Sequence, residues 1–296
     1  MTLQSLAENA ATIKPSAADI SKIRGLAEKG EPDMESLLGT LYGNGNGVQK
    51  DQAQALKWWR KAAEDGDAIA ACHLSGAYLY GEGIPQDRAE GIKWLRKSAE
   101  GGFSRAQWTL GTFYARGEFL PKDATEAVAW WKKAAGQGFT KAEGDLGAAY
   151  AIGIGTEKNY TKALELLQTS ADKGYASAEY SLGVMYGDGV GVPEDQSKAV
   201  TWWLKAADQE STGAANKLGD AYIQGKGVSR DPLLAYMWFD IASREIKSAA
   251  ENKTILGGFM THDELKQAKE LAHQWESTHY MKVKRELDNQ DLISTP

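Results

Sequence analysis

The feature that most constrains this sequence is a 36-residue repeat that runs through most of the chain without insertion or deletion. A tyrosine recurs at this step from Tyr42 to Tyr222, and a leucine and a glycine recur in step with it. A fixed period of this length is typical of solenoids, in which each repeat is one supersecondary unit stacked on its neighbours. The register holds from Leu38 to Phe239, and it therefore predicts six copies of one unit.

The pattern within each repeat predicts two helices. In the second copy Ala70, Leu74 and Tyr78 share one side of a first helix, at the spacing that a 3.6-residue turn requires. Glycines follow where the chain must reverse, and Asp87 then has the position and side chain of an N-cap for a second helix. The residues at this N-cap position are Asp51, Asp87, Asp123, Asn159, Asp195 and Asp231.

Small residues inside the first helices predict close packing. Glycine in a helix interior costs about 1 kcal/mol relative to alanine, yet glycine holds one such position in five of the six copies. We expect a tryptophan or tyrosine ring to lie over each gap. The residues at this position are Gly39, Ser75, Gly111, Gly147, Gly183 and Gly219.

The ends of the chain are predicted to differ from the repeats. Residues 15–30 match the second helix of an incomplete leading repeat, and residues 1–14 are predicted to be a flexible N-terminus. A Thr-x-x-Glu capping box at Thr261 predicts a helix within a C-terminal cap, 244–287, and residues 288–296 are predicted to be a disordered tail. The solenoid is predicted to span 15–243, with repeats at about 31–66, 67–102, 103–138, 139–174, 175–210 and 211–243.

The repeated unit, Leu-Gly-x-x-Tyr-x-x-Gly-x-Gly-Val followed by Asp-x-x-x-Ala-x-x-Trp-x-x-x-Ala-Ala-x-x-Gly, resembles the Sel1-like repeat, a relative of the tetratricopeptide repeat. The match is nearly complete in residues 38–66 and 182–207. The resemblance implies an all-α fold: a right-handed α-α superhelix (solenoid) of six 36-residue helical hairpins, with a leading half-repeat and a C-terminal capping helix. It also implies that the first helices line a concave surface.

The same resemblance implies a protein-binding function. Members of the family look like adaptors in bacterial signalling, host interaction and membrane-protein turnover, and some are similar to immunity proteins that neutralise secreted toxins. A cysteine-rich branch is associated with β-lactam binding or hydrolysis. The sharpest expectation is therefore a bacterial immunity protein whose partner is a toxin or effector, and the alternatives are an adaptor in signalling or complex assembly and a β-lactam-binding enzyme.

Charge and composition exclude several classes of function. The net charge of -6 disfavours nucleic acid as a partner, and one cysteine excludes an internal disulfide framework. No apolar run approaches the roughly 18 residues that cross a bilayer, so membrane insertion is not expected. The N-terminus lacks a signal-peptide pattern, which predicts a cytoplasmic protein as written, or a periplasmic one if a signal peptide had been removed.

No motif predicts catalysis, a cofactor or a metal. The glycine-rich runs lack the lysine and the preceding strand that phosphate-binding loops require, and the histidines form no ligand pair at helical spacing. Ser170 and Lys173 match the Ser-x-x-Lys motif of β-lactam-recognising enzymes, but Lys-Thr-Gly and Ser-Asp-Asn are missing and the Ser170 hydroxyl is expected to point into a helix interface. The protein is therefore predicted not to be an enzyme.

The second helices carry a basic stripe near their C-termini, including Arg60, Lys61, Arg96 and Lys97. Favourable interaction with the helix dipole explains this placement without any ligand. A patch for an acidic partner is the second hypothesis.

The positions that vary between repeats predict a binding surface. Positions that repeat must serve stacking, whereas the opposite side of the first helix is free to vary and should form a concave groove for a protein or peptide partner. Trp108 and Tyr180 are the proposed anchors, because aromatic residues and arginine are enriched in interface hot spots. The alternative is that both rings pack on neighbouring helices. The predicted groove residues are Trp108, Tyr180, Arg105, Lys141, Ile69, Cys72, Leu79 and Asn216.

Overall fold

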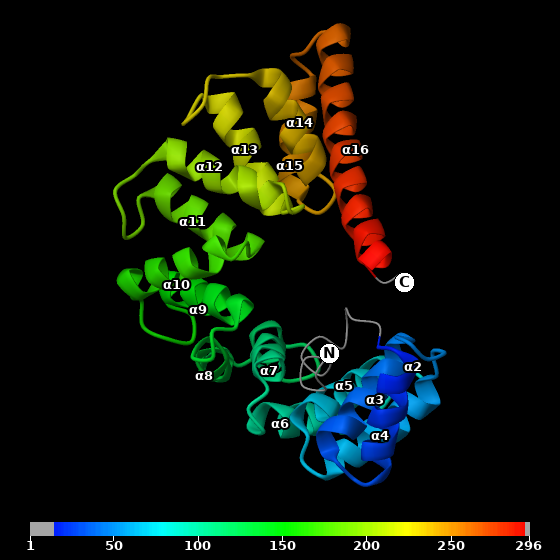
Figure 1. Ribbon diagram of the computed structural model, residues 1–296. Helices are drawn as coiled ribbons and strands as arrows, with labels where there is room; N and C mark the ends of the chain where they lie inside the picture. The colour runs from blue at the N-terminus through cyan, green and yellow to red at the C-terminus, as the bar shows by residue number, and fades with distance from the viewer. Residues whose placement is uncertain (1–14, 294–296) are drawn as a thin grey trace. The chain divides into compact units, whose positions relative to one another are not determined.

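The computed structural model describes residues 15–293, with side chains described as far as Thr278, and these residues form helices and turns with no strand (Figure 1). They divide into two compact units, one made of residues up to 137 together with those from 286 on, and the other of residues 138–285. The predicted flexible segment 1–14 and the end of the predicted tail, 294–296, lie outside the described residues. The all-α solenoid fold expected from the repeat is confirmed.

The first unit is a stack of helical hairpins. The hairpins pair α3 with α4, α5 with α6 and α7 with α8, and α2 packs on α3 as the expected second helix of a leading half-repeat. The helices are α2 (Ala17–Glu28), α3 (Pro32–Asn44), α4 (Gln52–Glu64), α5 (Ala68–Tyr80), α6 (Arg88–Glu100), α7 (Ser104–Arg116) and α8 (Ala124–Ala135).

The second unit continues the same pattern and adds two helices after the last repeat. Its hairpins pair α9 with α10, α11 with α12 and α13 with α14. The helices are α9 (Thr140–Ile152), α10 (Tyr160–Asp172), α11 (Ala176–Asp188), α12 (Gln196–Ala207), α13 (Thr212–Gln224), α14 (Pro232–Ala242), α15 (Lys247–Gly257) and α16 (His262–Ile293).

The predicted N-caps of the second helices are confirmed. In each of the six, the side-chain oxygen of the aspartate or asparagine accepts a hydrogen bond from a backbone N–H two or three residues further on, as from Gln54 to Asp51 at 3.0 Å. Each first helix ends at a glycine in the left-handed conformation, such as Gly81 with φ of 74°. Caps of both kinds satisfy backbone groups that a helix end leaves unpaired.

Two turn positions keep the left-handed conformation without glycine. Phe119 has φ of 59° and Glu210 has φ of 63°, at positions where the other repeats have glycine. A side chain in this region costs roughly 1–2 kcal/mol. The Phe119 ring offsets this cost with packing, since it lies 4.9 Å from the Phe113 ring and 6.1 Å from that of Tyr80.

Four of the five helical glycines at this position face an aromatic side chain of the second helix in the same repeat, whereas Gly147 faces Leu167, so the expectation of a ring over each gap is wrong for the fourth repeat. A methyl group at Gly39 would lie 2.5 Å from Cδ1 of Trp59, and one at Gly183 would lie 2.3 Å from Cδ1 of Trp203. These distances are shorter than van der Waals contact, so only glycine allows the two helices to approach with an indole between them. Phe239 fills the same role beside Gly219.

The last repeat is covered by α15 and α16. The predicted capping box at the start of α16 is confirmed, because the backbone N–H of Thr261 donates to Glu264 at 2.7 Å and the Glu264 N–H donates to the Thr261 hydroxyl at 3.3 Å. Ala268 and Ala272 are buried, and the Trp275 ring lies edge-on to Trp238 at 5.5 Å. The helix continues to Ile293 and so includes 288–293, which the sequence assigns to the tail. Of the helices described, none combines the length and the apolar character needed to cross a bilayer.

Candidate partner-binding surface

Two of the positions that repeat on the first helices are buried and the repeated tyrosine is half-buried, whereas one varying position is exposed. In α5, Ala70 and Leu74 have no exposed surface, whereas Ile69 is 45% exposed. The residues that occupy the Ile69 position in the next two repeats, Arg105 and Lys141, are also exposed. This position therefore presents a different side chain to solvent in each repeat, as a specificity-determining surface requires.

The position of Cys72 is only partly open, because the following repeat packs against it. Its equivalent Ser36 is buried and donates to Asp67 at 2.9 Å. In the second unit the Tyr175 ring covers the equivalent Gly144, where an added methyl group would lie 2.5 Å from Cδ1 of the ring. Neighbouring first helices touch each other, as α3 touches α5 and α9 touches α11. The sequence pattern within a single hairpin does not predict this contact between first helices of neighbouring repeats.

The two proposed anchors are half-buried. The Tyr180 ring lies against α13, where a methyl group at Gly213 would be 3.3 Å from Cε2, and it also packs on the hydrophobic core of the last repeats. Trp108 and Asn216 have intermediate exposure as well. Tyr180 therefore packs on a neighbouring helix, as the alternative prediction has it, and part of its surface stays exposed.

Leu79 is not a surface residue. Only 2% of it is exposed, and its side chain fills the space beside Gly91, where an added methyl group would lie 2.7 Å from the leucine Cγ. The prediction placed Leu79 in the groove only because it lies on the side of the first helix opposite Ala70 and Leu74. The second helix α6 covers that side of α5, and Leu79 therefore belongs to the core.

Cys72 and His73 are held in their uncharged forms by burial. Burial raises the pKa of the Cys72 thiol to about 11, and it lowers the pKa of His73 to about 4, with the nearby Arg105 charge lowering it further. The His73 ring stacks on Trp59 with centroids 4.6 Å apart and planes 9° apart. A thiol with so high a pKa has little nucleophilic thiolate at neutral pH.

The predicted residues fall into two separate sets. The first unit carries Ile69, Cys72, Arg105 and Trp108, and the second carries Lys141, Tyr180 and Asn216. Each set lies on the first helices of its own unit. We therefore treat the two surfaces separately.

Ser170 is engaged in the fold rather than in a catalytic arrangement. It is fully buried, and its hydroxyl donates to the carbonyl oxygen of Thr140 at 2.8 Å, as the sequence predicts. Lys173, the other member of the Ser-x-x-Lys pattern, pairs with Glu143 at 2.8 Å. A buried hydroxyl with this partner cannot reach a β-lactam carbonyl.

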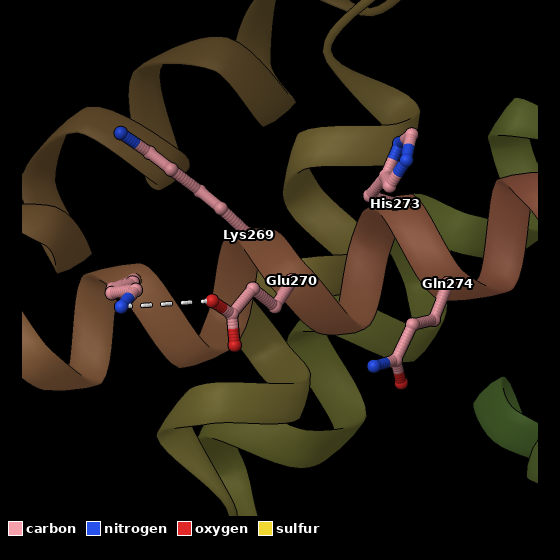
Figure 2. Close-up of a pocket in the computed structure, with 5 residues that line it drawn as sticks. Lys269, Glu270, His273 and Gln274 are labelled. Atoms are coloured by element: carbon pink, nitrogen blue, oxygen red, sulfur yellow. Dashed lines mark ion pairs between the residues drawn. The ribbon is translucent and has the colours of Figure 1, made fainter.

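Two hollows on the second unit are lined mostly by charged and polar residue types. One of about 370 Å³ lies along α16, and Figure 2 shows its side chains spreading over the helix surface instead of converging, with Lys266 paired to Glu270 at 4.0 Å. Another of about 380 Å³ lies beside Trp275, and in its wall Arg244 pairs with Glu276 while Thr212 donates to Glu245 at 2.8 Å. In the part of the chain with described side chains, no three histidine, cysteine, aspartate or glutamate residues gather into a metal site.

The sequence analysis missed a row of arginine–tyrosine hydrogen bonds in the first unit. Terminal nitrogens of Arg24, Arg60 and Arg96 donate to tyrosine hydroxyls at 2.9, 2.8 and 3.0 Å. The dipole explanation of Arg60 and Arg96 was incomplete, because each guanidinium also joins a second helix to the first helix that follows. The constant 18-residue spacing from arginine to tyrosine was the available signal. The acceptors are Tyr42, Tyr78 and Tyr114.

Comparison with known families and structures gives a consistent result. The model of the Sel1 repeat matches six consecutive segments, 32–67, 68–103, 104–139, 140–175, 176–211 and 212–245. The chain is similar to c5321, described as a protective antigen present in uropathogenic Escherichia coli strains displaying an SLR fold. That likeness has 32% identity and a TM-score of 0.79, and it covers 91% of this chain and 59% of that one.

A Sel1 repeat protein from Oxalobacter formigenes is also similar, at 28% identity and a TM-score of 0.68 over 81% of this chain and 93% of that one. Two immunity proteins from Pseudomonas aeruginosa match 78% of this chain and 83% of their own length at 18% identity. Their TM-scores are 0.43 and 0.44, and a likeness at that level carries no argument about function. Comparison with curated proteins gives no match.

Proposed function

Because the chain belongs to the Sel1 repeat family, we propose that it is a non-enzymatic scaffold that binds a protein or peptide through the exposed side of its first helices. Sel1 repeat proteins are protein-interaction scaffolds, and the Sel1 repeat fold is typically non-enzymatic. One observation carries the proposal for this chain: the positions of Ala70 and Leu74 are buried in every repeat, while Ile69, Arg105 and Lys141 vary at one exposed position.

The side chains of the first-unit surface suit protein recognition. Trp108 and Arg105 are of the types most enriched in interface hot spots, and Ile69 adds exposed apolar area beside them. An anchoring tryptophan or arginine costs about 2–4 kcal/mol of binding free energy when truncated to alanine. Tyr180 and Lys141 are the corresponding residues proposed for the second unit.

The test is capture of a partner with immobilised wild type, Trp108→Ala and Tyr180→Ala, each verified by circular dichroism at 222 nm. We expect the wild type to retain a partner that at least one of these variants loses while its helical signal stays unchanged. Ile255→Ala, which removes an exposed apolar side chain far along the sequence in α15, is the control and should retain the partner. Equal retention by all variants would refute the proposed anchors.

The finer proposal concerns the partner: a secreted toxin that this chain neutralises, with an adaptor role in signalling or complex assembly as the alternative. Adding the purified chain to the toxin encoded by an adjacent gene separates these roles, because an immunity protein inhibits at a one-to-one ratio.

Fractionation of cells decides between cytoplasmic and periplasmic placement of the protein. Hydrolysis of nitrocefin that disappears in Ser170→Ala would instead favour the β-lactam alternative, which the burial of Ser170 opposes.

A further inference from the structure

The first unit carries three arginines in equivalent positions, which we name the arginine row: Arg24 in α2, Arg60 in α4 and Arg96 in α6. All three are exposed. Each guanidinium is fixed by the tyrosine hydroxyl that accepts its hydrogen bond, and Arg96 also lies over the Tyr114 ring at 6.0 Å. A guanidinium has five N–H donors, so one bond to a hydroxyl leaves most of its donors available.

The arginine row forms no ion pair with a described carboxylate, although Glu28, Glu64 and Glu100 each follow one of its arginines by four residues. Every ion pair in this part of the chain joins other groups, and no described carboxylate lies within 4.0 Å of the three guanidiniums. The second unit does not continue the row, because Gln168 and Leu204 occupy the equivalent positions. The positive row is therefore a property of the first unit alone.

Lysines on tryptophan rings add to the positive charge around the row. Lys97 lies over the Trp94 ring at 4.7 Å, and Lys133 lies over the Trp130 ring at 3.7 Å. Neither lysine is paired with a described carboxylate. Cation–π contact of this kind holds an exposed ammonium in place.

We propose that the arginine row is a docking surface for an extended acidic protein segment, in which carboxylate side chains each take the free donors of one guanidinium. Charge complementarity carries this choice, since arginine presents a planar fork that matches a carboxylate. The net charge of -6 for the whole chain repels any polyanion, and it repels a nucleic acid, with its dense phosphates, more than a peptide with widely spaced carboxylates. The row is distinct from the surface of the proposed function.

The repeat geometry sets the spacing that such a segment needs. The three arginines lie on second helices one repeat apart, and successive repeats pack against each other through α4 with α5 and α6 with α7. Packed helices lie about 10 Å apart, and we take this distance as the step of the row. An extended peptide advances about 3.3 Å per residue. An acidic side chain at every third residue would therefore meet successive arginines of the row.

The experiment measures fluorescence anisotropy of a labelled peptide that repeats Glu-Ser-Ser, titrated with the full chain at low salt. A peptide of the same composition with all glutamates contiguous is the comparison. We expect the spaced peptide to bind more tightly. We also expect Arg60→Gln with Arg96→Gln to weaken its binding about tenfold or more, because the variant loses two charge-assisted contacts with the glutamates.

The matched control removes the same charge elsewhere in the first unit, by Arg116→Gln with Lys122→Gln, and should leave binding within about twofold. Tyr78→Phe keeps the charge of the row but releases Arg60, and should weaken binding by a smaller factor. Trp108→Ala should bind the spaced peptide like the wild type, because Trp108 is not part of the arginine row. A failure of this proposal is therefore distinguishable from a failure of the proposed function.

Three results would overturn the proposal. The first is equal loss in the control pair, which would mean nonspecific attraction. The second is equal binding of the spaced and contiguous peptides, or no binding of either. The third is tighter binding of a single-stranded RNA or of vesicles containing phosphatidylserine than of the spaced peptide, which would assign the row to another class of ligand.

Discussion

Single residues control how closely the helices of a repeat approach, and Gly183 is the clearest case. Its Cα lies beneath the Trp203 indole, which is only 4% exposed and has no room to move away. In contrast, a methyl group added at Gly76, inside α5, would meet no side chain and no neighbouring helix within 4 Å. Packing against Trp203 therefore requires glycine at position 183, whereas no packing contact requires glycine at position 76.

We expect Gly183→Ala to lower the free energy of unfolding by about 1–3 kcal/mol, because the new methyl group displaces the Trp203 ring. Gly76→Ala is the matched control, and it should raise stability by up to about 1 kcal/mol because alanine favours a helix without a clash. Urea titration followed by circular dichroism gives both values. Equal effects of the two substitutions would contradict the packing explanation.

Burial of His73 makes stability depend on pH. The folded-state pKa of about 4 lies below the ordinary value of 6.5, so the unfolded chain takes up a proton first as the pH falls. The contribution of neutral His73 is complete above pH 6.5 and is lost progressively between 6.5 and about 4.

We predict that His73→Phe, which keeps an aromatic ring beside Trp59, flattens this pH dependence. The wild type should lose up to about 1.4 kcal/mol more per pH unit than the variant within that window, since one proton is linked to unfolding. Urea titrations at pH 7, 6 and 5 test it. Parallel curves for the two proteins would show that His73 does not remain neutral in the folded state.

At the scale of helices, buried polar side chains tie the first helix of a repeat to the end of the second. Lys173 pairs with Glu143 at 2.8 Å, and Gln209 donates to Glu179 at 2.8 Å. In the first repeat Asp65 occupies the position of these donors and cannot donate to the fully buried Glu35. Lys61 contacts Glu35 there instead, at 2.5 Å.

We expect Asp65→Gln to stabilise the protein by about 1 kcal/mol or more, because the new amide can donate to the Glu35 carboxylate as Gln209 does to Glu179. Glu64→Gln removes the same charge from the adjacent residue and controls for the helix dipole, so its gain should be smaller. Thermal unfolding by calorimetry measures the difference. Equal gains would mean that the dipole alone is responsible.

The sequence predicted the helical hairpins well because their determinants are local. The N-cap position of Asp51 and the Gly39–Trp59 contact both lie within one repeat, and six copies display the same pattern. The candidate surface was predicted less well because its exposure depends on neighbours. Leu79 is covered by α6, and Ser36 is bonded to Asp67 of the following repeat. The angular position of a residue on one helix does not predict its contacts with neighbouring helices.

At the scale of the whole molecule, the hydrophobic clusters stay within the two units. The clusters around Leu38, Leu74 and Leu110 all lie in the first unit. Those around Leu182 and Leu218 lie in the second. Repeat proteins gain stability from contacts between adjacent repeats, so a group of neighbouring repeats can fold without the rest.

We therefore expect a fragment of residues 1–137 to fold by itself. Its circular dichroism should show helical minima and a cooperative thermal transition, because three hydrophobic clusters are retained intact. The same fragment carrying Leu74→Ala, which empties a fully buried position, should melt at a lower temperature. A fragment without a cooperative transition would show that the first unit needs the second.

The leucine pair Leu166 and Leu167 has an optical consequence. Every other repeat carries at least one tryptophan on its second helix, whereas residues 138–175 contain none. Opening of that fourth repeat alone would leave no indole newly exposed within it, while the ellipticity at 222 nm would fall. A mismatch between emission and ellipticity during denaturation would therefore locate the first region of the chain to come apart.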